Sequence, residues 1–179
     1  MTSNKTVRLV ITALFAALTY VATTLIQIPS PMSGYIHLGD GFVLLSGLVL
    51  GPFYGGLAAG IGSMLADLLS GYGHYVPGTF VIKFLAAFAC GWIFSLLKKR
   101  GNVKNLSTLA GIVGGMAGMV IVVIGYFFYS SLFLGKGIAA ISSIPGNILQ
   151  GITGTVVATL LFPVLYKLPT VQTFLEKAK

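Results

Sequence analysis

The sequence SMLADLLSGYGHYVPGTFVIKFLAAF, residues 63–88, decides the fold class of this chain. It contains two apolar runs separated by a short loop of glycine, tyrosine and histidine, and each run carries one charged residue, Asp67 or Lys83. Two apolar runs joined in this way predict a pair of antiparallel helices. Because a charge in apolar surroundings is costly unless it is paired or hydrated, both charged residues are candidates for function.

The composition extends this pattern to the whole chain. Hydrophobic residues make up 56 % of the 179 residues and charged residues only 8 %, which is too little charge to cover a water-soluble surface. The bilayer is therefore the expected solvent. The first apolar run lacks a small-residue cleavage site and is too long for a signal-peptide core, so we interpret it as a retained span. The net charge of +8 is spread over the ends of the runs, which does not favour a nucleic-acid partner.

Hydropathy and charge together predict six membrane-spanning helices in one domain, residues 1–179. Apolar runs cover residues 7–28, 52–70, 79–97, 106–134 and 138–165, and a shorter run covers 40–50. With six spans, all of the eleven basic residues except Lys83 and Lys136 lie on the side of the N-terminus. The positive-inside rule therefore favours an all-α integral membrane protein with both termini in the cytoplasm. The outer connections are then 29–39, 71–78 and 135–137.

Polar side chains gather near these outer connections. Asp67 and Lys83 flank the same outer loop and lie about 6–8 Å below it, at matching depth, so they can pair or bind a polar ligand together. Asn147 and Gln150 lie a few turns into the last run from the same side, at a spacing that brings them close together. The other candidates lie in the outer loops or next to them: Tyr35, His37, Asp40, His74 and Tyr75. This clustering predicts a solute pocket that opens outward.

Each candidate also has a purely structural explanation. Asp67 and Lys83 could pair only to brace two helices. Asp40 could cap the helix that follows it, and Asn147, after a Pro-Gly pair, could satisfy broken backbone. The histidines and tyrosines could be ordinary residues of the membrane interface.

Motifs for an energy source or for catalysis are missing from the sequence. It contains no GxxxxGK[ST] phosphate loop, no HExxH or CxxC metal spacing and no GxSxG nucleophile motif. We therefore expect no enzyme activity, no cofactor and no metal. A solute-binding membrane subunit that takes its energy from a partner fits, and the alternatives are a stand-alone secondary transporter or a small intramembrane enzyme. A secondary transporter usually shows paired, interrupted spans in two related halves, which we do not find here.

A surface for a partner helix is expected in the first run. In ITALFAAL, Ala13 and Ala17 have the small-xxx-small spacing that lets helices approach closely, and Ala16 lies beside them. The same pattern would also suit packing against helices of this chain.

The sequence resembles the substrate-binding S components of bacterial energy-coupling factor (ECF) vitamin transporters. The resemblance covers nearly the whole chain and rests on four segments: ALFAAL, YIHLGDGFVLLSGLVLGPFYGGLAAGIGSMLADLLSGY, PGTFVIKFLAAFACGW and IPGNILQGITG. Within that family the motifs are most similar to members assigned to pyridoxine or to the hydroxymethylpyrimidine precursor of thiamine, and also to riboflavin-type members.

The resemblance implies a six-helix protein of the bacterial cell membrane. Such a protein binds one vitamin near the outer face and docks on a membrane scaffold (T) subunit with two ATPases, with the first-run alanines at the contact. No metal-transport subunit is implied, since the N-terminus lacks a histidine-rich start.

Overall fold

The structure is a computed structural model that describes residues 4–25, 27–30, 34–99, 103–169, 171–172 and 175. Six α-helices follow one another close to the predicted runs. They are α1 (Asn4–Leu25), α2 (Asp40–Leu50), α3 (Pro52–Leu69), α4 (Val76–Lys98), α5 (Val103–Phe128) and α6 (Ile144–Leu165). The last helix begins later than predicted because a 3-10 helix, η3 (Gly137–Ser143), precedes it, and a π-helical turn, η2 (Tyr129–Phe133), extends α5.

A small β-hairpin interrupts the helical pattern. Strands β1 (Gln27–Ser30) and β2 (Gly34–His37) pair antiparallel, with Gln27 opposite His37. The sequence predicts only a connection between two helices over residues 29–39, so the hairpin corrects this prediction. Strands of four residues are too short to show a clear alternation of polar and apolar residues. Contact with the bundle supports this hairpin, since the Gln27 amide donates to the Ser70 hydroxyl at the end of α3 (3.0 Å).

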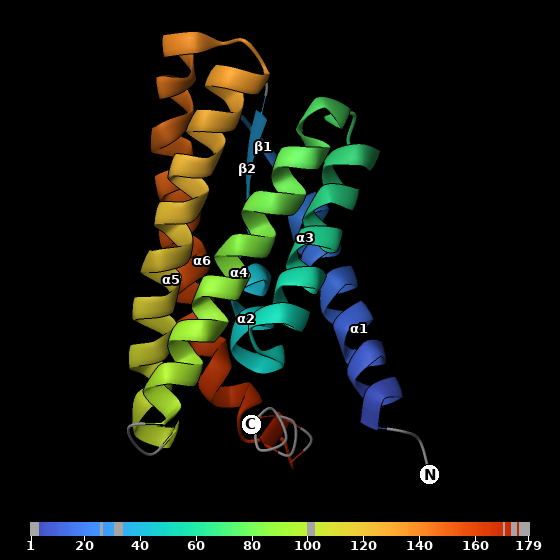
Figure 1. Ribbon diagram of the computed structural model, residues 1–179, viewed down its shortest axis with the longest axis vertical. Coiled ribbons are helices and arrows are strands. Elements are labelled where there is room, and N and C mark those ends of the chain that lie inside the picture. The colour runs from blue at the N-terminus through green and yellow to red at the C-terminus, as the bar shows by residue number, and fades with distance from the viewer. Residues whose placement is uncertain are drawn as a thin grey trace.

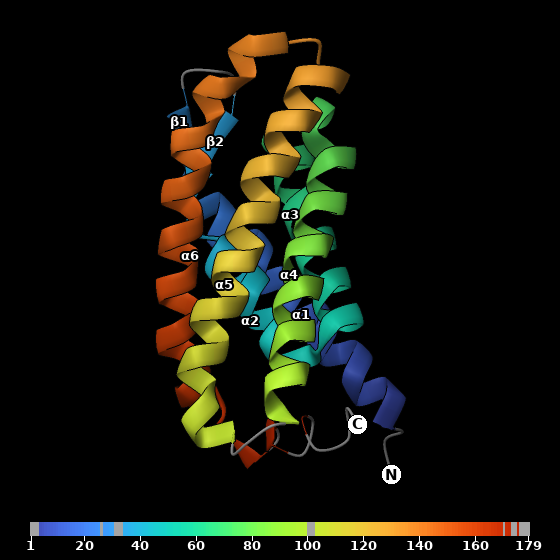
Figure 2. The ribbon, with the colours of Figure 1, turned by 60° about the vertical axis from the view of Figure 1, so that its left-hand side comes forward.

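The connections group at two ends of the molecule, as the sequence predicts. The hairpin, the 3-10 helix η1 (Gly73–Tyr75) and η3 lie at one end, which we call the hairpin end (Figure 1). The start of α1, the end of α6 and the junction between α2 and α3 lie at the opposite end, which we call the terminal end (Figure 1, Figure 2).

Within the described residues, four helical segments are long and apolar enough to cross a membrane: Lys5–Leu25, Gly73–Lys98, Thr108–Phe133 and Gly137–Leu165. The 11 residues of α2 extend over about 16 Å, roughly half of a hydrocarbon core. The predicted fold class is thus supported for four helices, and the count of six spans stays a prediction.

The short helix α2 lies at the centre of the bundle. It packs against α1, α3, α4 and α6, while α1, α3, α4, α5 and α6 follow one another around it. It is apolar on all sides, which is typical of a helix buried inside a protein. Its approach to α4 is very close, because a Cβ atom on Gly47 would lie 2.2 Å from the Ala87 carbonyl oxygen.

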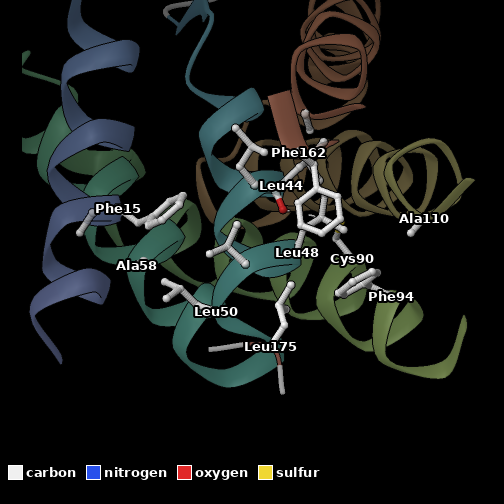
Figure 3. Packing of buried hydrophobic residues seen from close by; sticks show 14 residues of the cluster. Phe15, Leu44, Leu48, Leu50, Ala58, Cys90, Phe94, Ala110, Phe162 and Leu175 are labelled. Carbon is white, nitrogen blue, oxygen red and sulfur yellow. Dashed lines mark hydrogen bonds between the residues drawn. The ribbon is translucent and has the colours of Figure 1, made fainter. Parts of the chain in front are cut away.

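The interior divides into an apolar part and a polar part. Toward the terminal end, Leu48 of α2 packs in one hydrophobic cluster with large side chains from other helices, among them Phe15, Phe94 and Phe162 (Figure 3). We call the hydrophobic cluster that contains them the terminal plug. Toward the hairpin end the buried side chains include Asp40, Asp67, Lys83 and Gln150.

Helix α1 presents two different faces. Ala13 and Ala17 are exposed, whereas Ala16 is buried against α3. A Cβ atom on Gly62 of α3 would lie 2.3 Å from the Ala16 carbonyl oxygen, so the two backbones nearly touch. The expectation that Ala16 shares a docking face with Ala13 and Ala17 is therefore wrong: Ala16 belongs to the core of this protein.

Candidate functional site

A pocket lies at the hairpin end, between β2, the α3–α4 connection, α5 and the start of α6. Its cavity volume is about 70 Å³, or about 580 Å³ when the gaps between the wall atoms and the open solvent at its mouth are counted as well. The residues that line it are Tyr35, Ile36, His37, Asp67, Tyr72, Tyr75, Tyr126, Ser130, Ser143, Gly146, Asn147 and Gln150.

Asp67 anchors one wall of this pocket. Its two carboxylate oxygens accept hydrogen bonds from the Tyr35 hydroxyl (2.7 Å) and the Thr79 hydroxyl (2.5 Å). The hydroxyls of Thr79 and Tyr126 lie 2.9 Å apart, which extends the hydrogen-bonded group onto α5. Burial and the Asp67 carboxylate raise the pKa of Tyr35 far above its usual range, so Tyr35 keeps its proton and acts as a donor.

Lys83 forms its ion pair with Asp40. The Lys83 ammonium lies 2.5 Å from one Asp40 oxygen, and the Gln150 amide donates to the other (3.0 Å). Lys83 therefore does not pair with Asp67, which was one of the two arrangements that the sequence allowed, although both residues lie at the predicted end of the bundle. Helix spacing predicts how deep a side chain lies in the bundle, but it does not predict which other helix lies beside it. Here the neighbour is α2, which places Asp40 next to Lys83. The proposed role of Asp40 as a helix cap is also wrong, because the N-cap is Gly39 and has no side-chain bond.

The same network fixes Gln150 and His37. The Gln150 side-chain oxygen accepts from the His37 backbone N–H (3.2 Å), so both ends of this amide have partners. The His37 ring is buried, and its Nδ1 accepts from the Gly39 N–H (3.0 Å). Burial, and then the nearby Lys83 charge, lower the pKa of His37 from 6.5 to about 3. His37 is thus a neutral, structurally bonded residue rather than a free residue of the membrane interface.

Tyrosines form much of the remaining wall. The rings of Tyr35 and Tyr72 lie 4.9 Å apart and those of Tyr75 and Tyr126 lie 6.2 Å apart. Such rings supply faces for an aromatic ligand and hydroxyls for hydrogen bonds. His74 lies outside this wall: it is exposed, and its backbone oxygen accepts from the Tyr129 hydroxyl (2.9 Å).

The structure brings six of the predicted site residues to the pocket and leaves three outside it. Tyr35, His37, Asp67, Tyr75, Asn147 and Gln150 line it. Asp40 and Lys83 lie behind Gln150, and His74 lies outside the wall.

The predicted site does not include the residues that α5 and its extension contribute. Tyr126 and Ser130 line the pocket, and both lie in YFFYSS at the hairpin end of α5. A hydroxyl-bearing cluster at that depth is the signal that could have identified them. Tyr72 lies in the same connection as the predicted Tyr75. Among the described residues, no group of three His, Cys, Asp or Glu side chains is placed to hold a metal ion.

A family model described as the S component of ECF-type riboflavin transporters matches residues 3–167. The chain belongs to this family. S components are the substrate-binding parts of ECF vitamin transporters, so this chain is a membrane transport protein and not an enzyme. A protein of Pyrococcus woesei, described as an uncharacterized protein in the gap 3' region, is 31 % identical over 138 residues, which cover 76 % of this S component and 86 % of that protein.

Proposed function

We propose that this S component captures a small heteroaromatic vitamin in the tyrosine-walled pocket and delivers it through a scaffold (T) subunit and two ATPases. Pyridoxine and hydroxymethylpyrimidine are the preferred ligands, with a riboflavin-type ligand as the next choice. The observation that carries the proposal is the combination of four tyrosines with Asp67, Asn147 and Gln150 around one cavity. Aromatic walls with a few polar groups suit a hydroxylated heteroaromatic ring.

We infer that the pocket faces the outside of a bacterial cell membrane. Lys5 and Arg8 in α1, Lys98 at the end of α4 and Lys99 directly after it lie at the terminal end. Lys167 follows α6 at the same end. Basic residues favour the cytoplasmic side, which supports six spans, cytoplasmic termini and an outward hairpin end.

The exposed face of α1 is the proposed contact with the scaffold subunit. Ala13 and Ala17 lie on it, next to Leu14 and Leu18. These leucines form one wall of a groove lined only by apolar residues from α1, α2, α6 and the segment after α6. Small residues beside an apolar groove allow a partner helix to approach closely.

The test is to identify the ligand and the energy source separately. Mass spectrometry of the detergent-purified protein should find a co-purified vitamin, and calorimetric titration should confirm its binding. Uptake into liposomes should require the scaffold subunit, both ATPases and ATP. Proton-coupled flux by this chain alone, without binding of any vitamin from a broad panel, would instead support a stand-alone secondary transporter.

A further inference from the structure

The described wall of the pocket holds one carboxyl group and no lysine or arginine side chain. Among the described residues that line the pocket, Asp67 and His37 are the ones with an acidic or basic side chain. His37 is neutral, since its pKa is lowered to about 3. Lys83 is fully buried and committed to Asp40 at 2.5 Å, so that pair is electrically balanced.

The carboxylate oxygens of Asp67 can accept a further hydrogen bond from a ligand. Each of its oxygens accepts one hydrogen bond, from Tyr35 or from Thr79, and a carboxylate oxygen can accept two. The Asp67 residue is only 7 % exposed. A carboxylate with little water around it interacts more strongly with a nearby charge than one on the surface.

The tyrosine rings also favour a positively charged ligand, because the face of an aromatic ring attracts cations. Lys83 and Lys136 already lie 5.4 Å and 5.2 Å from the ring centres of Tyr126 and Tyr75, so cations do approach these rings. Tyr35 and Tyr72 add two more rings beside Asp67. The positive charge of Lys136 would repel a cationic ligand. This side chain is half-buried and donates to the Tyr75 hydroxyl (2.9 Å). Solvent therefore screens its charge more than it screens the charge of the buried Asp67.

We propose that the pocket selects a positively charged heteroaromatic ligand over the neutral or anionic form of the same ring. An ammonium or a protonated ring nitrogen binds beside Asp67 and between the tyrosines. A phosphate ester is rejected, because among the described lining residues there is no cationic side chain to pair with it. This inference rests on the proposed function and narrows its class of ligand.

The test uses ligands that share a ring and differ in charge. The pyridine set is pyridoxamine (ammonium), pyridoxine (hydroxyl) and pyridoxine 5'-phosphate. The pyrimidine set is the aminomethyl, hydroxymethyl and phosphorylated forms of 4-amino-2-methylpyrimidine. In calorimetric titrations at pH 7 the ammonium form of the bound set should have a Kd about tenfold lower than the hydroxyl form, and the phosphate form should not bind detectably.

Two variants assign the preference to Asp67. Asp67→Asn should bring the ammonium and hydroxyl forms to within about twofold of one another. Glu176→Gln makes the same change in net charge elsewhere in the sequence and should keep the preference. Thermal unfolding of both variants checks that they fold.

The outcomes separate this inference from the proposed function. If no ligand of either set and no flavin binds, the proposed function fails and the inference falls with it. If a neutral or phosphorylated form binds as tightly as the ammonium form, only the charge preference is overturned. If Asp67→Asn folds and retains the preference, the assignment to Asp67 is wrong, and if it does not fold, the comparison in the unmodified chain decides the question.

Discussion

Lys83 is the residue on which the buried polar network depends. It is fully buried, and its only ion pair within the described residues is with Asp40. Removing one member of a buried ion pair leaves the other charge without compensation, which costs about 3–5 kcal/mol, whereas removing both is much less costly.

We expect Lys83→Met to lower the thermal unfolding temperature strongly and Asp40→Asn/Lys83→Met to recover most of the loss. The matched double variant Asp67→Asn/Lys83→Met should not recover it, because Asp40 remains charged and unpaired. Thermal unfolding in detergent measures all three. Recovery by the Asp67 variant instead of the Asp40 variant would contradict the observed pairing.

His37 gives the stability a defined pH dependence. The folded protein holds its pKa at about 3, below the ordinary 6.5, so the folded state binds fewer protons than the unfolded state between these values. Its contribution to stability is therefore present above pH 6.5 and is lost as the pH falls from 6.5 toward 3. His37→Asn keeps an acceptor for the Gly39 N–H and cannot be protonated in this range.

We expect His37→Asn to reduce the fall of the unfolding temperature between about pH 6.5 and pH 4, because it removes this titrating group. An equal slope in the wild-type and His37→Asn proteins would show that His37 is not held neutral by the fold.

At the scale of the helix, the alanines of α1 point in two directions: one packs inside the bundle, and two are available to a partner. Ala16 packs against Gly62 of α3, while Ala13 and Ala17 face outward. A bulky side chain at an outward position leaves the bundle intact and blocks only a partner, whereas the same side chain at Ala16 cannot be accommodated.

Ala13→Trp and Ala17→Trp should therefore bind the vitamin with normal affinity and fail to support ATP-dependent uptake with the partner subunits. Ala16→Trp should fail to fold. Val120→Trp, on an exposed face of α5, is the control and should transport normally. Calorimetry and liposome uptake distinguish these results, and normal uptake by both outward variants would exclude this face as the contact.

The close contact between α2 and α4 depends on glycine. Gly47→Ala should lower stability by about 1–3 kcal/mol, because its Cβ would overlap the Ala87 carbonyl and force the helices apart. Gly73→Ala is the control, since a Cβ there meets no atom within 4 Å and its φ is not positive. Equal unfolding temperatures for the two variants would show that the helices can separate at little cost.

The sequence predicts the depth of a residue in the bundle better than the direction in which its side chain points. The depth of a residue follows from helix rise, and so Asp67, Asn147 and Gln150 reach one pocket as expected. The direction of a side chain around its helix does not follow for α2, because this helix is apolar on all sides and its pattern does not indicate which helix faces Asp40. The alanine pattern of α1 likewise indicates close packing, but not whether the neighbour is α3 or a partner.

At the scale of the whole molecule, the pocket and the terminal plug divide the bundle. The pocket holds polar side chains at the hairpin end, while the plug fills the other part with apolar ones such as Leu48, Phe94 and Phe162 (Figure 3). The polar pocket of the described residues therefore lies at the hairpin end, with the apolar plug between it and the terminal end.

The terminal plug makes this protein an electrical insulator. An ion in an apolar interior loses its hydration at a cost of tens of kcal/mol, whereas a potential of about 100 mV supplies only about 2.3 kcal/mol per charge. The protein alone should therefore add no conductance to a planar lipid bilayer. Currents above the lipid background from the unmodified protein would contradict this. A cell can thus keep many copies of a protein with such an open pocket in its membrane without losing the membrane potential.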